Sequence, residues 1–312
     1  MGHADPVVRI LTDQDIAAAS LPLMDVYDLV VEGFRLQARG EFECPPKVGI
    51  HTRPGAFTHA MPAYLPTKDL AGTKLVSVYP DNPARGLPSL TGLILMMDPE
   101  TGMVTDQIDA AWVTKVRTAM VSMVDAQWLG NPDPVFGVIG ATGVTGRAHL
   151  DAIATVFPGS RVLVGSRSPE RLRNLLADFA AAPIEIVAAP SDEAIVRECD
   201  VVIVCTAHLP QPILKAEWLR AGQNIINVHM RGWFPDVLAS VDLVSCDDRR
   251  PVMDPQNGLV TLYPGLDPDL ELGQVVLGAR SGREGAQQTI MSFNYGLGIF
   301  DILVADYVRT RV

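Results

Sequence analysis

Three glycines at fixed spacing are the residues of this sequence best suited to holding a ligand. The apolar run Val135–Ile139 ends at Gly140, and Gly143 and Gly146 follow before a stretch with helical spacing. This order is typical of a strand, a glycine turn and a helix, in which the three glycines allow the tight turn, the approach of a ligand and close helix packing. Such a turn presents free N–H groups and a helix dipole to a pyrophosphate. The residues predicted to bind it are Gly140, Thr142, Gly143, Val144, Thr145 and Gly146.

The residues after the next apolar run predict which dinucleotide binds. The run 161–165 follows a helix-length gap, as a βαβ unit requires. An enzyme that selects NAD usually has an acid here for the ribose 2′-hydroxyl. The chain instead has Ser166, Arg167 and Ser168, with Arg171 one turn on. Because a guanidinium and hydroxyls suit a 2′-phosphate, we expect NADP to be favoured over NAD. The alternative is that both arginines are solvated residues at a helix start.

Composition narrows the class of protein. The 312 residues are 48% hydrophobic and contain no run of eighteen apolar residues, so we expect no membrane span and a cytoplasmic location. The net charge of −11 argues against a nucleic-acid partner. The cysteines and histidines lack metal-ligand spacing, and we expect no metal site.

Elements predicted on either side of the glycine turn suggest two domains. Before it, the sequence predicts alternating β-rich runs and two long helices, over 22–39 and 111–129. The second helix ends at Gly130–Pro134, a helix-breaking segment that marks the domain boundary. After it, short β-rich runs at α/β spacing predict a mostly parallel sheet, and 289–311 has helical spacing. The predicted fold class is α/β. A Rossmann NADP-binding domain spans 131–288, and residues 1–130 with 289–312 form a second α/β domain for dimerisation and substrate.

Several motifs together resemble those of the ornithine cyclodeaminase/μ-crystallin family, which includes ketimine reductases and an archaeal alanine dehydrogenase. They are Pro45-Pro-Lys47, Met61–Pro66, Gly72–Val78, Asn82–Pro88, Asp98–Gly102, Lys115–Ala119 and Asp301. The resemblance covers most of the chain. It implies a homodimer built through the first segment and the terminal helix, with the active site in the cleft beside the Rossmann domain.

The resemblance also implies roles for individual residues. Lys47 stands where the family often has an Arg that binds the substrate carboxylate, Lys74 where it has a substrate-binding Lys, and Arg117 matches its RTA motif; Lys74 and Arg117 are the expected catalytic pair. Cations converging on a pocket in an acidic protein suit an anionic substrate. Tyr295 would face the substrate. The cofactor would be approached by Ser89, Arg117, Thr118, Cys205, Thr206, Ala207, His229, Met230, Arg231 and, in the last helix, Asn294. The alternative is that Lys47 and Lys74 are solvated strand-end lysines and Arg117 is a structural ion-pair partner.

Two positions depart from the family pattern. The turn reads GxxGxxG, one residue longer between its first glycines than the family's GxGxQ, and Thr145 replaces the Gln. Cyclodeaminases carry an Asp where this chain has Gly232, and that Asp serves deamination and ring closure. Cyclodeamination of an amino acid is therefore disfavoured.

Two functions of different classes follow from these residues. The first is an NAD(P)-dependent oxidoreductase acting on a C=N/CH–NH bond next to a carboxylate, as in an imine reductase or amino-acid dehydrogenase; Lys74 would be the proton donor, its pKa lowered by burial near Arg117. The second is a μ-crystallin-like protein that binds NADPH and a small ligand with little turnover. The YxxxK of short-chain dehydrogenases, formally met by Tyr64 and Lys68, fails because Pro66 interrupts it.

Overall fold

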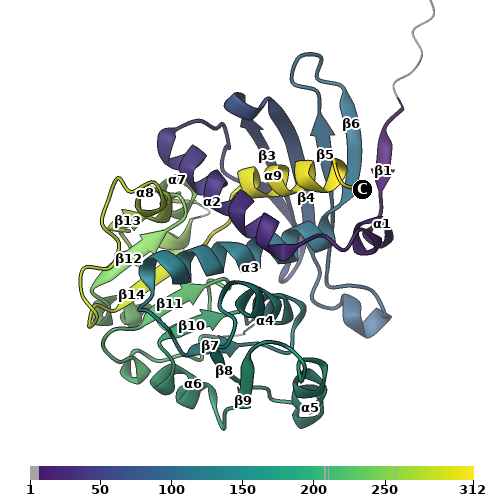
Figure 1. Cartoon of the computed structure of the whole chain (residues 1–312). Helices are drawn as coiled ribbons and strands as arrows, with labels where there is room; N and C mark the ends of the chain where they lie inside the picture. The colour runs from purple at the N-terminus through teal and green to yellow at the C-terminus, as the bar shows by residue number, and fades with distance from the viewer. Residues whose placement is uncertain (1–6, 207–208, 210, 257) are drawn as a thin grey trace, which may run out of the picture. The chain divides into compact units, whose positions relative to one another are not determined.

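A computed structural model describes residues 7–206, 209, 211–256 and 258–312 (Figure 1). The chain divides into two compact units, 1–117 with 297–312 and 118–296. The division lies within one continuous helix, α3, and after the last strand of the second unit. Among the described residues, no helix is both long and apolar enough to cross a bilayer.

The first unit is a six-stranded sheet with helices on one face. The strand order is β1-β6-β5-β4-β3-β2, and only β1 pairs in parallel. Neighbouring side chains point to opposite faces of such a sheet, so one face is available for packing against α9 and α2. The elements are β1 (Arg9–Leu11), α1 (Asp13–Ala18), α2 (Leu23–Arg39), β2 (Val48–Arg53), β3 (Ala56–Leu65), η1 (Pro66–Lys68), β4 (Leu70–Val78), η2 (Asn82–Arg85), β5 (Leu90–Met97), β6 (Val104–Asp109), α3 (Ala110–Leu129) and α9 (Gly298–Arg309).

Helix α9 lies directly on the sheet of this unit, packed against β3, β4 and β5 (Figure 1). Gly72 in β4 permits this approach, because a Cβ there would lie 2.7 Å from Ile302 Cδ1 of the helix. The helix is buried along almost its whole length, including the carboxylate of Asp301. The terminal helix thus forms part of the core of the first unit.

The second unit is an eight-stranded sheet in which every observed pairing is parallel. Its order, β13-β12-β14-β11-β10-β7-β8-β9, is that of a Rossmann-like sheet built outward from β7. The elements are β7 (Phe136–Ile139), α4 (Val144–Val156), β8 (Arg161–Val164), α5 (Pro169–Asp178), β9 (Glu185–Ala188), α6 (Asp192–Glu198), β10 (Val201–Val204), η3 (Ala216–Trp218), β11 (Asn224–Asn227), η4 (Pro235–Ser240), β12 (Leu243–Cys246), α7 (Arg249–Val252), η5 (Leu259–Thr261), β13 (Leu270–Glu271), α8 (Leu272–Val276) and β14 (Ile290–Phe293).

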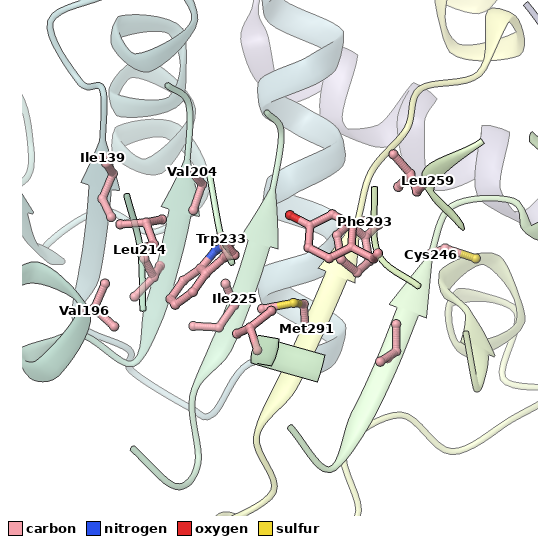
Figure 2. Close-up of a cluster of buried hydrophobic side chains, with 14 of the residues drawn as sticks. Ile139, Val196, Val204, Leu214, Ile225, Trp233, Cys246, Leu259, Met291 and Phe293 are labelled. Atoms are coloured by element: carbon pink, nitrogen blue, oxygen red, sulfur yellow. The ribbon is translucent and has the colours of Figure 1, made fainter. Parts of the chain in front are cut away.

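One face of this sheet carries a large apolar core. Side chains from six strands and from the segments crossing them form this core, which includes Phe293 and Trp233, the latter 1% exposed (Figure 2). The central strands β7 and β10 are buried on both faces and read as unbroken apolar runs, which explains why their positions were predictable.

One predicted element is wrong in its first part. The stretch 289–311 was expected to be a single helix, but Ile290–Phe293 is a strand between β11 and β12, and the helix begins at Gly298. Asn294 therefore follows β14 and does not lie in the last helix. The apolar residues at 290, 293 and 297 fit a helical period equally well, which is the ambiguity of short buried strands.

Candidate active site

The first unit contains a buried cluster of two cations around one carboxylate. Lys74 in β4 donates to Asp301 Oδ1 over 2.7 Å, and Arg117 Nε donates to the same oxygen over 2.9 Å. Lys74 and Asp301 are 0% exposed and Arg117 is 8% exposed. Asp301 comes from α9, Lys74 from β4 and Arg117 from α3, so two helices and the sheet together form the cluster. The other oxygen, Oδ2, has no hydrogen-bond partner among the described residues.

Burial and neighbouring charge make Lys74 a weak base. Desolvation first, and then the charge of Arg117, lower the pKa of Lys74 from 10.5 to about 7, against the opposing effect of Asp301. Lys74 is therefore not a solvated strand-end lysine. A lysine with such a pKa exchanges protons near neutral pH, as a general acid or base must.

A third cation, Lys47, lies close enough for its charge to lower the pKa of Lys74 as well. Its charge acts in the same direction on His59 in β3, where burial is the main cause of a pKa of about 4. The structure thus brings together three of the four residues predicted to bind substrate, Lys47, Lys74 and Arg117, and the fourth, Tyr295, lies in the second unit. With three basic groups around one carboxylate, this cluster carries net positive charge in an acidic chain, and it suits an anionic ligand.

In the second unit, the glycine turn has the shape expected of a dinucleotide cradle. Gly140 has a φ of +89°, and a Cβ at Gly146 would lie 2.4 Å from the Gly140 carbonyl oxygen, so neither position accepts a side chain. Gly143 is exposed, with only that oxygen near its missing Cβ. Helix α4 starts at Val144, and its first N–H groups have no intrahelical acceptor. These residues fit a pyrophosphate, which would accept from those amides.

Thr142 and Thr145 are half-buried in this turn, and Val144 is exposed at its edge. Thr145 also uses its carbonyl to fix His149, whose Nδ1 lies 2.7 Å from it while Nε2 lies 3.0 Å from Ser122 Oγ. The bond to Thr145 involves its main chain and not its side chain, and the contact of His149 with Ser122 links helix α4 to helix α3.

The residues after β8 form the predicted 2′-phosphate site. Arg167 and Arg171 are exposed, while the hydroxyls of Ser166 and Ser168 accept from the backbone of the turn, at 3.2 Å from Ser168 N and 3.3 Å from Arg171 N. Ser168 is thereby the N-cap of α5. The two arginines flank a capped helix start, and both are exposed.

Other predicted cofactor residues gather at the carboxyl ends of β10, β11 and β14. Thr206 Oγ1 lies 3.1 Å from His229 Nδ1, and Cys205 is nearly buried beside His149. Asn294 is 9% exposed, with Nδ2 at 3.5 Å from Asp125 and Oδ1 unpaired among the described residues. Met230 and Tyr295 are half-buried against the apolar core, and Arg231 is exposed. Thr118 and Ser89 are half-buried in their own units, and Ala207 lies outside the described residues.

Position 232 is closed to a side chain. A Cβ on Gly232 would lie 2.9 Å from Val204 Cγ1 and 3.4 Å from Leu214 Cδ1, and all three residues are buried. The acid that cyclodeaminases place at this point therefore has no room in this chain. Within the described part of the chain, no three His, Cys, Asp or Glu side chains are arranged to hold a metal ion.

Comparison with known proteins shows the family to which the chain belongs. A model of the ornithine cyclodeaminase/mu-crystallin family matches residues 7–312. The chain belongs to this family. It is 33% identical over 304 residues to nodulation efficiency protein NfeD of Rhizobium meliloti, covering 96% of this chain and 94% of that protein. It is 29% identical over 309 residues to an alanine dehydrogenase of Archaeoglobus fulgidus, covering 96% of this chain and 93% of that protein.

A solved structure agrees closely in fold. Delta(1)-pyrroline-2-carboxylate reductase of Thermococcus litoralis, in complex with NADH and L-proline, matches with a TM-score of 0.86 at 25% identity, over 97% of both chains. The predicted fold class, family and oxidoreductase character are confirmed, and a nicotinamide dinucleotide is supported as the cofactor.

Asp301 is the member of the buried cluster to which the sequence analysis gave no role. It was part of the family resemblance, but its pairing with Lys74 joins residues 227 positions apart. A signal was present, because a lone acid among the apolar residues of the last helix must find a buried partner.

Proposed function

We propose that this chain is a homodimeric, NADP-dependent oxidoreductase that acts on a C=N bond next to a carboxylate, reducing an imine or forming one from an amino acid. The observation that carries the proposal is the buried Lys74–Asp301–Arg117 cluster, in which a lysine with a pKa near 7 lies beside a guanidinium. Reduction of C=N requires a proton at nitrogen and a fixed carboxylate, and this cluster offers a group for each role.

Arg117 is the main carboxylate-binding residue in this proposal. Asp301 engages its Nε, so its two terminal Nη groups are the remaining donors for a carboxylate. Lys47 adds a second positive charge. Lys74 delivers the proton to the imine nitrogen, directly or through a water molecule, and regains one from solvent. In the reverse direction, neutral Lys74 accepts that proton.

A bound nicotinamide cofactor supplies the hydride in one direction and receives it in the other. Val144, Thr145 and Gly146 would hold its pyrophosphate by their N–H groups, and Arg167 would hold the 2′-phosphate that distinguishes NADP from NAD. Thr206, His229 and Asn294 are placed at the strand ends where the nicotinamide half of a dinucleotide lies in this fold.

Cyclodeamination is a weaker candidate because Gly232 is packed against Val204. An aspartate at this position, which the family uses for ring closure, would have to displace a buried valine of β10. The chain is therefore better suited to stopping at the amine or imine than to closing a ring.

Support for a homodimer comes from the uncovered face of the first sheet. By register, apolar side chains from four strands lie together on the face opposite Lys74, and their exposure reaches 71%. An exposed apolar sheet face of this kind is the usual sign of a subunit interface. These side chains are Ile10, Val48, Ile50, Leu75 and Leu93.

Spectrophotometric turnover tests the activity. NADPH oxidation is followed at neutral pH with a panel of cyclic ketimines and with 2-oxo acids plus amines, and NADP reduction is followed with a panel of amino acids. We expect turnover of at least one carboxylate-bearing imine and none of its decarboxylated analogue. Arg117→Met should raise KM and lower kcat together, because a loosely held substrate is also misoriented. NADPH binding without any turnover would favour the binding-protein alternative.

A further inference from the structure

A carboxylate lies at the end of β8, where the sequence itself has no acid. Asp192 is the first residue of α6, after the following strand, β9. Its Oδ1 lies 3.4 Å from the point that a Cβ on Gly165 would occupy, and Gly165 directly follows β8. Strand β8 is the second strand of the Rossmann unit that starts with β7, and a Rossmann domain contacts the adenosine ribose at the end of its second strand. Residues 165–168 contain no acid, but the fold brings Asp192 from the next βα unit next to them.

Among the described residues, Asp192 has no hydrogen-bond partner to offset its burial. It is half-buried, and within the described residues its carboxylate takes part in no hydrogen bond or ion pair. Burial raises the pKa of Asp192, and the nearby charge of Arg167 only partly opposes this. A partly desolvated acceptor without a donor costs free energy, which a hydroxyl of a ligand would recover.

Helix stabilisation alone does not explain this position. An acid in the first turn of α6 interacts favourably with the helix dipole, but the adjacent Glu193 supplies the same charge and is paired with Arg197 at 2.7 Å. Glu193 is therefore a matched control for any test of Asp192.

We propose that Asp192 is a second cofactor-selecting residue, whose carboxylate accepts a hydrogen bond from the ribose 2′-hydroxyl of NAD(H) and repels the 2′-phosphate that Arg167 attracts. The chain then binds both dinucleotides, with Arg167 favouring NADP(H) and Asp192 limiting that preference. The inference rests on the proposed function only in taking a dinucleotide as the ligand.

Fluorescence titration of the full chain tests this with NADH, NADPH and the 2′-deoxyadenosine analogue of NADH. For Asp192→Ala we expect the Kd for NADH to rise about tenfold, because a charge-assisted hydrogen bond is lost. The Kd for NADPH should fall about threefold or more, because a like charge is removed. Glu193→Ala should change neither the Kd for NADH nor the Kd for NADPH. In the parent protein the 2′-deoxy analogue should bind about tenfold more weakly than NADH, and in Asp192→Ala equally well.

The assignment would be overturned if Asp192→Ala changed the Kd values for NADH and NADPH equally. It would also be overturned if the ratio of these two Kd values were the same in Asp192→Ala as in Glu193→Ala. Equal binding of NADH and its 2′-deoxy analogue by the parent protein would overturn it as well, and this measurement needs no variant to fold. Because binding is measured without substrate, these outcomes are separate from a failure of the reductase proposal, which would appear as missing turnover with normal cofactor binding.

Discussion

Replacing Asp301 by asparagine should destabilise the first unit and change the pH range in which the protein works. The carboxylate is fully buried and accepts from Lys74 Nζ at 2.7 Å and Arg117 Nε at 2.9 Å. Removing one partner from a buried ion pair costs about 3–5 kcal/mol. Asparagine keeps an oxygen acceptor of the same shape, so we expect a loss near the lower end, about 3 kcal/mol in the free energy of unfolding.

The loss should depend on pH with a definite sign. The folded-state pKa of Lys74, about 7, lies below its ordinary 10.5, so charging this lysine disfavours the folded state and stability falls as pH drops from 10.5 towards 7. Without Asp301, which raises that pKa, the lysine resists protonation further. The difference between Asp301→Asn and the parent should therefore grow as pH falls below about 7.

Urea unfolding at pH 6 and pH 9, beside the pH dependence of kcat, measures both effects. For imine reduction, the limb assigned to Lys74 should move to lower pH in Asp301→Asn. Asp306→Asn is the control on the same helix, because its carboxylate pairs with Arg309 at 2.8 Å while 29% exposed. That variant should lose less than about 1 kcal/mol and keep the limb. Equal losses for the two variants, with an unmoved limb, would refute the reasoning.

Three further outcomes are expected. Lys74→Met should chiefly lower kcat and remove one limb of the pH–rate profile, whereas Lys68→Met, a change at a partly exposed lysine, should do neither; near-parental kcat for Lys74→Met would exclude it as the acid. Arg167→Ala should weaken NADPH binding by about 1.5–3 kcal/mol in fluorescence titrations and leave NADH nearly unchanged; equal losses would contradict its role. Leu75→Arg should yield a monomeric mass by light scattering at micromolar concentration, while Met103→Arg, outside the apolar sheet face, should not; a monomeric parent would remove the proposal.

The elements that position the cofactor were predictable because their signals are local. The glycine turn between β7 and α4 is a short pattern with its own conformational requirements, and α2 has a clear apolar stripe. Strand β14 was not predictable in this way. A four-residue strand buried on both faces has no period of its own, and the sequence after it, with Gly296 and Gly298, was the only indication that the helix starts later.

Residues of the candidate site could be predicted only where they belong to a sequence motif of the family. Lys74 and Arg117 follow from the family resemblance, and the burial of Lys74 was expected from the chemistry. Their common partner, Asp301, and the acid beside Gly165, Asp192, are placed by tertiary contacts between segments far apart in the chain. Neither contact leaves a spacing that can be read along the sequence.

The closed space at Gly232 restricts how this chain could acquire a new activity. An aspartate introduced there in a single step would press its Cβ to within 2.9 Å of Val204, a fully buried residue in the centre of a parallel sheet. A smaller residue at 204 must come first, at some cost in stability and no gain in activity. The order of substitutions is therefore fixed: a laboratory lineage selected for ring closure should accumulate the change in β10 before, and never after, the change at position 232.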